Sequence, residues 1–422
     1  MTSRERLIQT LNHEEPDKVV VDLGSTAITG INANALAKLR DSLGLEKRKI
    51  KVNEPLQLLG MVEEDVRQAL HIDVVDITNN MTMFGFENTG WKPFKLQTNL
   101  EVEVPQDFNT TVDEEGITYL YAQGDMNYPP ASRMPKDGHY FDHITRGNIE
   151  YDEDTVGAKE DFKDDFGILT DKELRFIEDR CNYFYNNTGY GMIGGGALAG
   201  LGDFALVPGP NVKQPKGIRN IPDFMMAHMI CPDYIHEIYD YQTDIALENA
   251  KLFKQACGDK IQAIIISGTD FGTQNGPFMS LDNFREFYKP YYTKINNWVH
   301  ENTNWKTFYH TCGAVTTFLQ DFYEMGVDIL NPVQLSAAGM DGKMLKEQWG
   351  DKFTFWGGGV DTQKTLPFGT PEEVYKEVTE RLQLFSKNGG FVFNPVHNIQ
   401  GQTTAENMLA MFKAIDDFNQ NK

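Results

Sequence analysis

Short apolar runs alternate with segments of helical periodicity along most of the chain. Eight of these runs are rich in β-branched residues and have the length of buried strands. Since a closed α/β barrel is built from eight such units, the pattern predicts an α/β fold, a single (β/α)8 TIM barrel over residues 1–422. The predicted strands are Val19–Leu23, Ile72–Ile77, Gly191–Ala197, Ile261–Ser267, Thr307–Cys312, Asp328–Val333, Thr354–Gly358 and Phe391–Val396. Thr370 and Thr403, each three residues before a glutamate, predict helix starts with capping boxes.

Residues 78–190 separate the second and third predicted strands, which is too long for a plain crossover. Alternating apolar residues from 100 to 140 surround the turn at residues 113–116 and predict a small antiparallel sheet. Residues 152–173 contain nine acidic and three basic residues, as expected of a solvated loop and helix start. We therefore expect one elaborated barrel domain with a β-containing insertion at about 97–180.

Polar residues follow several of the predicted strands. In a TIM barrel this is where the functional groups gather. Asp270 and Gln274 follow the fourth run, Asn331 and Gln334 lie in and after the sixth, and Asp361 follows the seventh. We expect these five side chains to line one pocket, with Asp270 handling a proton and the others binding substrate. The alternative is structural, since both aspartates could cap the next helix and Asn331 could complete a turn.

His310 and Cys312 are separated by one residue in the fifth predicted strand, so both side chains point to the same face. They are suitable ligands for zinc, and an open tetrahedral site needs three protein ligands. His397, which follows the eighth run at the same barrel mouth, is the candidate third ligand. A buried histidine beside an inert core cysteine is the alternative interpretation of the first two residues.

Composition restricts the setting of this chemistry. The N-terminus has no apolar signal core, no run is long enough to span a membrane, and four widely spaced cysteines form no disulfide framework. We therefore expect a cytoplasmic protein. The net charge of -22 argues against nucleic acids and anionic membranes as partners.

Two segments resemble the uroporphyrinogen decarboxylase superfamily. The opening of the chain, through Arg4–Arg6, Leu11–Val19 and Val21–Asp22, is similar to the start of that superfamily, and Asn394–Gln400 is similar to its last barrel strand and loop. The resemblance extends over nearly the whole chain and implies one barrel with two functional branches. One branch decarboxylates the acetate groups of tetrapyrroles without a cofactor. The other comprises zinc-dependent methyltransferases that exchange a methyl group with a corrinoid carried by a partner protein.

The decarboxylase branch has an arginine-rich segment directly after the first strand, which binds substrate carboxylates. The equivalent stretch here, Gly24–Gly30, contains no arginine, so bidentate capture of carboxylates would need another site. In the methyltransferase branch, zinc is held by a His-x-Cys on the fifth strand and a cysteine in the last loop. His310 and Cys312 match this pattern, whereas His397 stands where those enzymes have cysteine and where decarboxylases have a histidine without a metal.

The resemblance thus implies zinc and a corrinoid (cobalamin) as cofactors, a small methylated substrate, and a corrinoid protein as partner, because no Asp-x-His-x-x-Gly sequence is present. Two imidazoles and one thiolate leave zinc more electrophilic than two thiolates would, which favours demethylation of a donor. A tetrapyrrole decarboxylase and a non-catalytic ligand-binding barrel remain the alternatives, and metal content would separate them. The methyl donor and the oligomeric state do not follow from the sequence.

Overall fold

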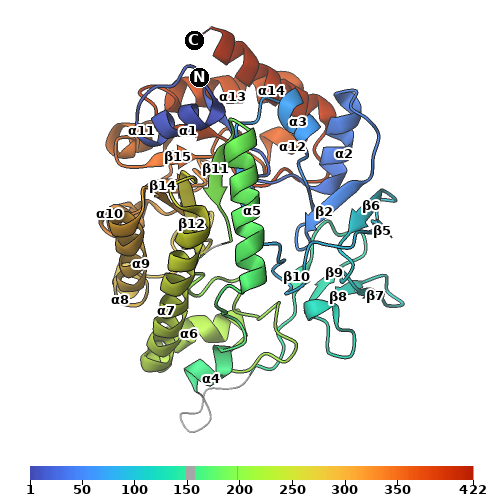
Figure 1. The fold of residues 1–422 in the computed structure, drawn as a ribbon, viewed down its shortest axis with the longest axis vertical. Coiled ribbons are helices and arrows are strands. Elements are labelled where there is room, and N and C mark those ends of the chain that lie inside the picture. The colour runs from blue at the N-terminus through green and yellow to red at the C-terminus, as the bar shows by residue number, and fades with distance from the viewer. Residues whose placement is uncertain (149–156, 197, 422) are drawn as a thin grey trace.

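The structure, a computed structural model, describes residues 1–148, 157–196 and 198–421 (Figure 1). Within these residues, an eight-stranded parallel sheet has the order β1-β16-β15-β14-β13-β12-β11-β4. Each predicted strand coincides with one of its members, so the predicted TIM barrel is confirmed. The strands are β1 (Val20–Val21), β4 (Val74–Ile77), β11 (Gly191–Gly194), β12 (Ala263–Ser267), β13 (Lys306–His310), β14 (Ile329–Asn331), β15 (Thr354–Trp356) and β16 (Phe391–Phe393).

The barrel closes between its first two strands. The Asp73 amide donates to the carbonyl of Val21 (2.8 Å), and the Val21 amide donates to the Asp73 carboxylate (2.9 Å). A side chain thus substitutes for one bond of a regular ladder at this seam.

A cluster of apolar side chains fills the barrel interior. Every strand contributes at least one residue, and Leu7 and Leu11 of the first helix cover the N-terminal end. The strand residues are Val20, Val74, Ile193, Ala263, Ile265, Phe308, Ile329, Trp356 and Val392. Because side chains alternate along a strand, Phe308 and His310 face the interior while Tyr309 packs outward against the helices.

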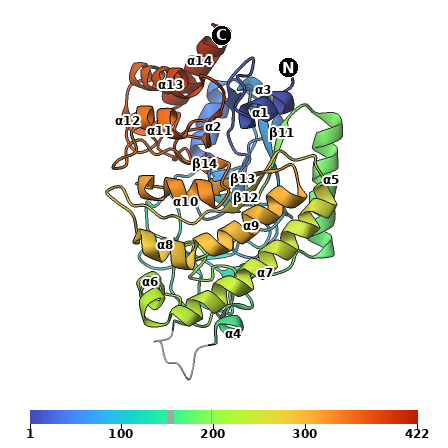
Figure 2. The same cartoon turned by 90° about the vertical axis from the view of Figure 1, so that its left-hand side faces the viewer.

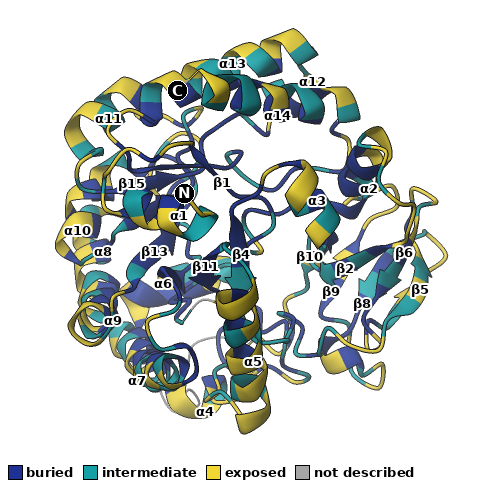
Figure 3. Ribbon diagram, turned by 45° about the horizontal axis from the view of Figure 1, so that its top comes forward, coloured by how far each residue is buried: buried dark blue, intermediate teal, exposed yellow. Residues whose placement is uncertain are grey.

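Helices surround the sheet and bury a second core against it; Figure 3 shows buried strands inside helices whose outer faces are exposed. In Figure 2, α7 and α9 lie side by side along one flank. Helices that follow barrel strands are α3 (Glu64–Ala69), α5 (Asp171–Asn187), α7 (Pro232–Cys257), α9 (Lys289–Asn302), α10 (Leu319–Glu324), α11 (Gly342–Trp349), α13 (Pro371–Phe385) and α14 (Ala405–Gln420). The others are α1 (Ser3–Leu11), α2 (Ala33–Ser42), α4 (Ala158–Phe162), α6 (Ile221–Ile230), α8 (Leu281–Phe287) and α12 (Thr365–Phe368), with 3-10 turns at Ala122–Gly124 and Thr316–Phe318.

Helix starts agree only in part with the sequence. Thr370 forms the predicted capping box at the start of α13. At α14 the N-cap is Thr404 rather than Thr403, and its hydroxyl accepts from the amide of Asn407. The pattern of a threonine three residues before a glutamate was therefore misleading at that end. None of the described helices is both long and apolar enough to cross a membrane.

Two small sheets lie beside the barrel, at the lower right of Figure 1. The hairpin that surrounds residues 113–116 is formed by β7 and β8, as the alternation predicts. The second sheet also includes β2 and β3, which precede β4, because β2 pairs in parallel with β6. The strands are β2 (Ile50–Glu54), β3 (Leu59–Gly60), β5 (Lys92–Lys95), β6 (Glu101–Val104), β7 (Thr110–Val112), β8 (Thr118–Leu120), β9 (Ser132–Met134) and β10 (Asp142–His143).

The division into one domain with an insertion at about 97–180 stays a prediction. Part of it, residues 149–156, lies outside the described residues, as do the start of the acidic stretch at 152–173 and Ala197 of the third predicted strand.

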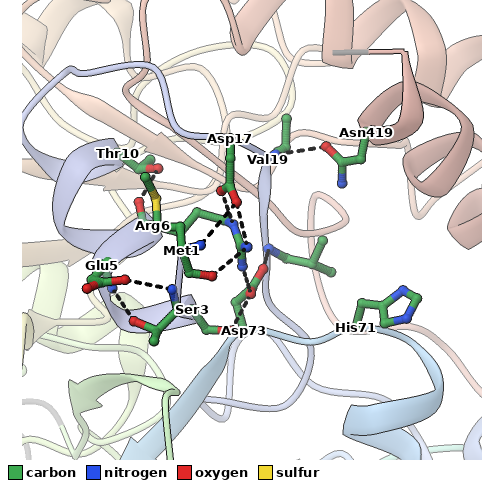
Figure 4. A network of polar contacts seen from close by, with 12 residues as sticks. Met1, Ser3, Glu5, Arg6, Thr10, Asp17, Val19, His71, Asp73 and Asn419 are labelled. Atoms are coloured by element: carbon green, nitrogen blue, oxygen red, sulfur yellow. Dashed lines mark hydrogen bonds and ion pairs between the residues drawn. The ribbon is translucent and has the colours of Figure 1, made fainter.

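Ion pairs and a hydrogen bond connect α1 to the seam between β1 and β4 (Figure 4). The Arg6 guanidinium contacts Asp17 (2.8 Å) and Asp73 (2.5 Å), and the Ser3 hydroxyl donates to Asp73 (2.6 Å). Burial raises the pKa of Asp73, while the Arg6 charge opposes that rise. Arg6, Asp17 and Asp73 therefore each have a partner of opposite charge within the chain.

Candidate metal site and its cavity

The structure brings His310, Cys312 and His397 together at the C-terminal mouth of the barrel. Their ligand atoms all lie within 4.8 Å of one another, and Cys312 Sγ is 3.4 Å from His310 Nε2. Two ligands of one tetrahedral zinc ion, at about 2.1 and 2.3 Å from the metal, are about 3.5 Å apart. The donor set and its spacing therefore fit a zinc ion.

Cys312 reaches this position by leaving the sheet. β13 ends at His310, two residues earlier than predicted, although the Thr311 amide still donates to the carbonyl of Asn331 (2.7 Å). The Cys312 amide instead donates to Asp270 Oδ1 (2.6 Å). The Asp270 carboxylate, in the loop after β12, thus accepts the hydrogen bond that the Cys312 amide would donate to a neighbouring strand if β13 were longer.

Asn331 fixes the tautomer of His310. Asn331 Nδ2 donates to the carbonyl of Trp356 (2.8 Å), so its Oδ1 faces His310 and accepts from Nδ1–H at 2.6 Å. The lone pair of His310 is therefore on Nε2, the nitrogen nearest to Cys312. Such a buried partner orients a metal-binding imidazole and raises its basicity.

Burial shifts the pKa of two of the three side chains toward their neutral forms. Burial lowers the pKa of His397 to about 4, and nearby His310 lowers it further than Asp270 raises it, so the ring is neutral at pH 7. Burial and the adjacent Asp270 carboxylate raise the pKa of the Cys312 thiol. A bound cation would reverse this preference for the thiol, because metal binding displaces the proton.

One carboxyl group, Asp270, contacts the triad, and a second, Asp203, lies within range of the Asp270 charge. Asp270 Oδ1 is 3.7 Å from His310 Nε2 as well as bonded to the Cys312 amide. Asp203, in the loop after β11, accepts from the Ala205 amide (2.8 Å). Burial raises the pKa of Asp203 to about 7, and the charge of Asp270 adds to the rise.

Gln274 and Gln334 connect three loops around the mouth. Gln334 Oε1 accepts from the Gly313 amide (2.8 Å), and Gln334 Nε2 donates to Gln274 Oε1 (2.9 Å). Gly313 has φ +88°, and a Cβ there would lie 2.3 Å from the carbonyl oxygen of Gly272. A side chain at that position would separate the loops that hold Cys312 and Gln274.

A cavity of about 590 Å³ opens beside the triad, and Cys312, His397, Gln274 and Gln334 line it. Asp270 and Asn331 contact the triad from behind and are not among the described lining residues. Asp361 is not among them either, because its carboxylate accepts from the amides of residues 363 and 364 in a turn. Asp361 is thus part of a turn before α12, whose N-cap is Lys364 and not Asp361, and its role in substrate binding stays a prediction.

The sequence analysis overlooked several residues around the mouth. Gln363, Gln400 and Gln402 also line the cavity, a few residues after the ends of the seventh and eighth predicted strands. Because they lie several residues beyond those ends, a search of the strand ends alone did not find them. The close spacing of Gln400 and Gln402 in the sequence was a signal that could have found them. Asp203 was missed because the third predicted strand ends in a glycine-rich run that gives no clear loop boundary.

The comparisons with known proteins agree with this architecture. The family model for uroporphyrinogen decarboxylase (URO-D) matches residues 214–418, which carry the whole triad. The C-terminal half of the chain thus resembles the uroporphyrinogen decarboxylase family. A methyltransferase from Methanosarcina mazei has a similar structure, with TM-score 0.55, 18% sequence identity and coverage of 99% of each chain. No curated protein matches the chain in sequence.

The loop after β1 is the stretch in which the sequence resemblance to decarboxylases leads us to expect arginines. In this chain Gly24–Gly30 lies against the loop of His397, since Asn398 Oδ1 accepts from the Gly30 amide (2.5 Å) and Asn398 Nδ2 donates to the carbonyl of Ala27 (2.8 Å). The segment therefore borders the candidate site but offers no guanidinium to a carboxylated substrate.

Proposed function

We propose that this protein is a zinc-dependent methyltransferase that moves a methyl group from a small methylated compound to a corrinoid on a partner protein. The observation that carries the proposal is the convergence of two imidazole nitrogens and one thiol sulfur at the barrel mouth. The fold neighbour in Methanosarcina mazei is a methyltransferase, which adds support. The missing arginines after β1 speak against the decarboxylase alternative.

The proposed reaction balances without a further redox partner. The bond between the methyl carbon and its oxygen, nitrogen or sulfur breaks, and cobalt(I) supplies both electrons of the new carbon–cobalt bond, becoming cobalt(III). The leaving heteroatom keeps its electron pair and takes a proton. Zinc held by two neutral imidazoles and one thiolate carries a charge of about +1 and supplies Lewis acidity for that leaving atom.

The residues of the chain prepare this step. His310 Nε2 is directed by Asn331, and Asp270 fixes the Cys312 backbone, so the donor atoms stand in place before a substrate arrives. Asp270, beside the triad, is placed to hold or deliver the proton that the leaving group requires. We assign Gln274 and Gln334 to the substrate cavity, where they hold the loops in register.

The test has two readouts, metal content and methyl transfer. Protein purified without chelator should contain about one zinc per chain. Adding it to cob(I)alamin and a panel of methyl ethers, methylamines and methyl thioethers should produce the absorbance of methylcobalamin. Zinc-free protein, or release of carbon dioxide from uroporphyrinogen at an enzymatic rate, would contradict the proposal.

A substitution at His397 tests the proposed direction. His397→Cys reproduces the ligand set of two thiolates and should keep zinc, while the demethylation rate falls and a thiol becomes a better methyl acceptor. His397→Ala should lose zinc and serves as the comparison. If His397→Cys demethylates as fast as the natural protein, ligand charge does not set the direction of transfer.

A further inference from the structure

The cavity beside the triad contains no fixed charge among its described lining residues. Twelve residues line it, and none is Asp, Glu, Lys or Arg. Five of the twelve are glutamines, namely Gln274, Gln334, Gln363, Gln400 and Gln402. This is unusual for a chain with 100 charged residues in 422, the sum of 39 basic and 61 acidic ones.

The glutamines are of two kinds. Gln274, Gln334 and Gln400 use their amides in hydrogen bonds within the chain, Gln400 by donating to the carbonyl of Asn398 (3.2 Å). Gln363 and Gln402 are exposed at the rim, and neither side-chain amide makes a hydrogen bond to another described residue. Each of these two amides can therefore donate to and accept from a ligand in the cavity.

The lining also lacks what charged ligands need. Carboxylates, sulfonates and phosphates are normally bound by Arg or Lys, and quaternary ammonium groups by Trp, Tyr or Phe faces. The twelve described lining residues include none of these side chains. Behind the triad, the Asp270 carboxylate would offset the charge of about +1 on a zinc ion held there.

We propose that this cavity selects an uncharged methyl donor, one that hydrogen-bonds through hydroxyl or amide groups to Gln363 and Gln402. The inference rests on the proposed function, because it names the substrate class of the same site. Methylated carboxylates, sulfonates and quaternary ammonium compounds are poor ligands of the cavity. Selection comes from the neutral, hydrogen-bonding lining and not from an ion pair.

Three methyl ethers of similar size test the charge selection: 2-methoxyacetamide, 2-methoxyacetate and (2-methoxyethyl)trimethylammonium. Their binding to the zinc-loaded protein is measured by ligand-observed NMR without corrinoid. The amide should bind at least about tenfold more tightly than either ion. Equal or tighter binding of an ion, or no measurable binding of any of the three, would overturn the proposal.

A charge added at the rim should change the preference. Gln363→Lys, with Gln402→Lys as a second variant, should improve binding of 2-methoxyacetate about fivefold or more. Gln348→Lys, on the exposed face of α11 away from the cavity, is the matched control and should leave all three affinities unchanged. An identical change in both kinds of variant would mean that general charge, and not the cavity, is responsible.

Methyl transfer separates this inference from the proposed function. Selective binding of the amide without methylcobalamin formation from any donor would remove the methyltransferase assignment and leave the charge selection. Methyl transfer from 2-methoxyacetate as fast as from 2-methoxyacetamide would support the methyltransferase assignment and contradict the charge selection.

Discussion

At the N-terminal end of the barrel, Arg6 and Asp73 are both buried and bonded to each other, whereas at the C-terminal mouth Cys312 lines a cavity and Asp203 lies within range of the Asp270 charge. The first pair helps to close the seam between β1 and β4 and has its full set of partners within the chain. At the mouth, burial without a compensating cation raises the pKa of both groups. The ion pair at the seam is thus satisfied within the chain, whereas the two groups at the mouth have the perturbed pKa values that are typical of functional sites.

The largest effect should come from removing the thiol. We expect Cys312→Ser to lose most of its zinc and to lower methyl transfer about thousandfold, because one of three ligands is missing. Since Cys312 is partly exposed, unfolding free energy should change by less than about 1 kcal/mol. Metal analysis and urea denaturation measure the two quantities.

The control for that variant is Cys231→Ser, which removes a buried thiol between α6 and α7. It should keep zinc and turnover per folded molecule. Loss of zinc in both variants would mean that the triad does not hold the metal.

Arg6→Met should show the opposite behaviour. Breaking this buried pair leaves the Asp73 carboxylate uncompensated and should cost about 3 kcal/mol of unfolding free energy. Zinc content per folded molecule should stay unchanged. Arg175→Met, on the exposed face of α5, should change stability by less than about 0.5 kcal/mol. Similar losses in both arginine variants would contradict the special role of the seam.

Asn331→Val tests the tautomer of His310. Without its Oδ1 acceptor, the imidazole loses its orientation, and zinc affinity should fall about 10-fold to 100-fold. A competition titration with a chelating indicator measures this. Asn296→Val removes a buried asparagine that bonds to the carbonyl of Met325, far from the mouth, and should not weaken zinc binding. Unchanged affinity in Asn331→Val would show that this hydrogen bond does not prepare the site.

The smallest effect concerns Asp203 and pH. Its pKa is raised from 3.8 to about 7, so the folded state holds a proton that the unfolded chain releases, and stability from this group falls as pH rises from about 4 to about 7. Because asparagine does not ionise, Asp203→Asn does not lose stability over this pH range. The variant should be more stable than the natural protein by about 1.5 kcal/mol at pH 8, less than the full pKa difference implies because the side chain is partly exposed.

Asp65 provides the contrast, because its hydrogen bonds with Arg40 lower its pKa to about 2. Asp65→Asn should be destabilised equally from pH 5 to pH 8, since the carboxylate is ionised throughout. Urea denaturation midpoints over that range measure both variants. A flat difference for Asp203→Asn would show that its carboxyl is already ionised in the folded protein.

Local patterns in the sequence were sufficient for the barrel and for the triad. Period-two alternation and apolar runs identify all eight barrel strands, and alternation alone places His310 on the inner face. Because the carboxyl ends of parallel strands meet at one mouth, His397 could be grouped with His310 and Cys312 before any coordinates. These inferences depend only on the direction of side chains along a strand.

Other features depended on how the loops pack, which no local pattern encodes. Asp361 lies in a turn and does not line the cavity, the Asn331 side chain bonds to His310, and Gln363 lines the cavity from a position several residues after its strand. The parallel pairing of β2 with β6 crosses about 50 residues and was likewise invisible. The sequence determined which side chains point toward the mouth, and the closed barrel decided which of them meet, because contacts between loops follow from the positions of all eight strands together.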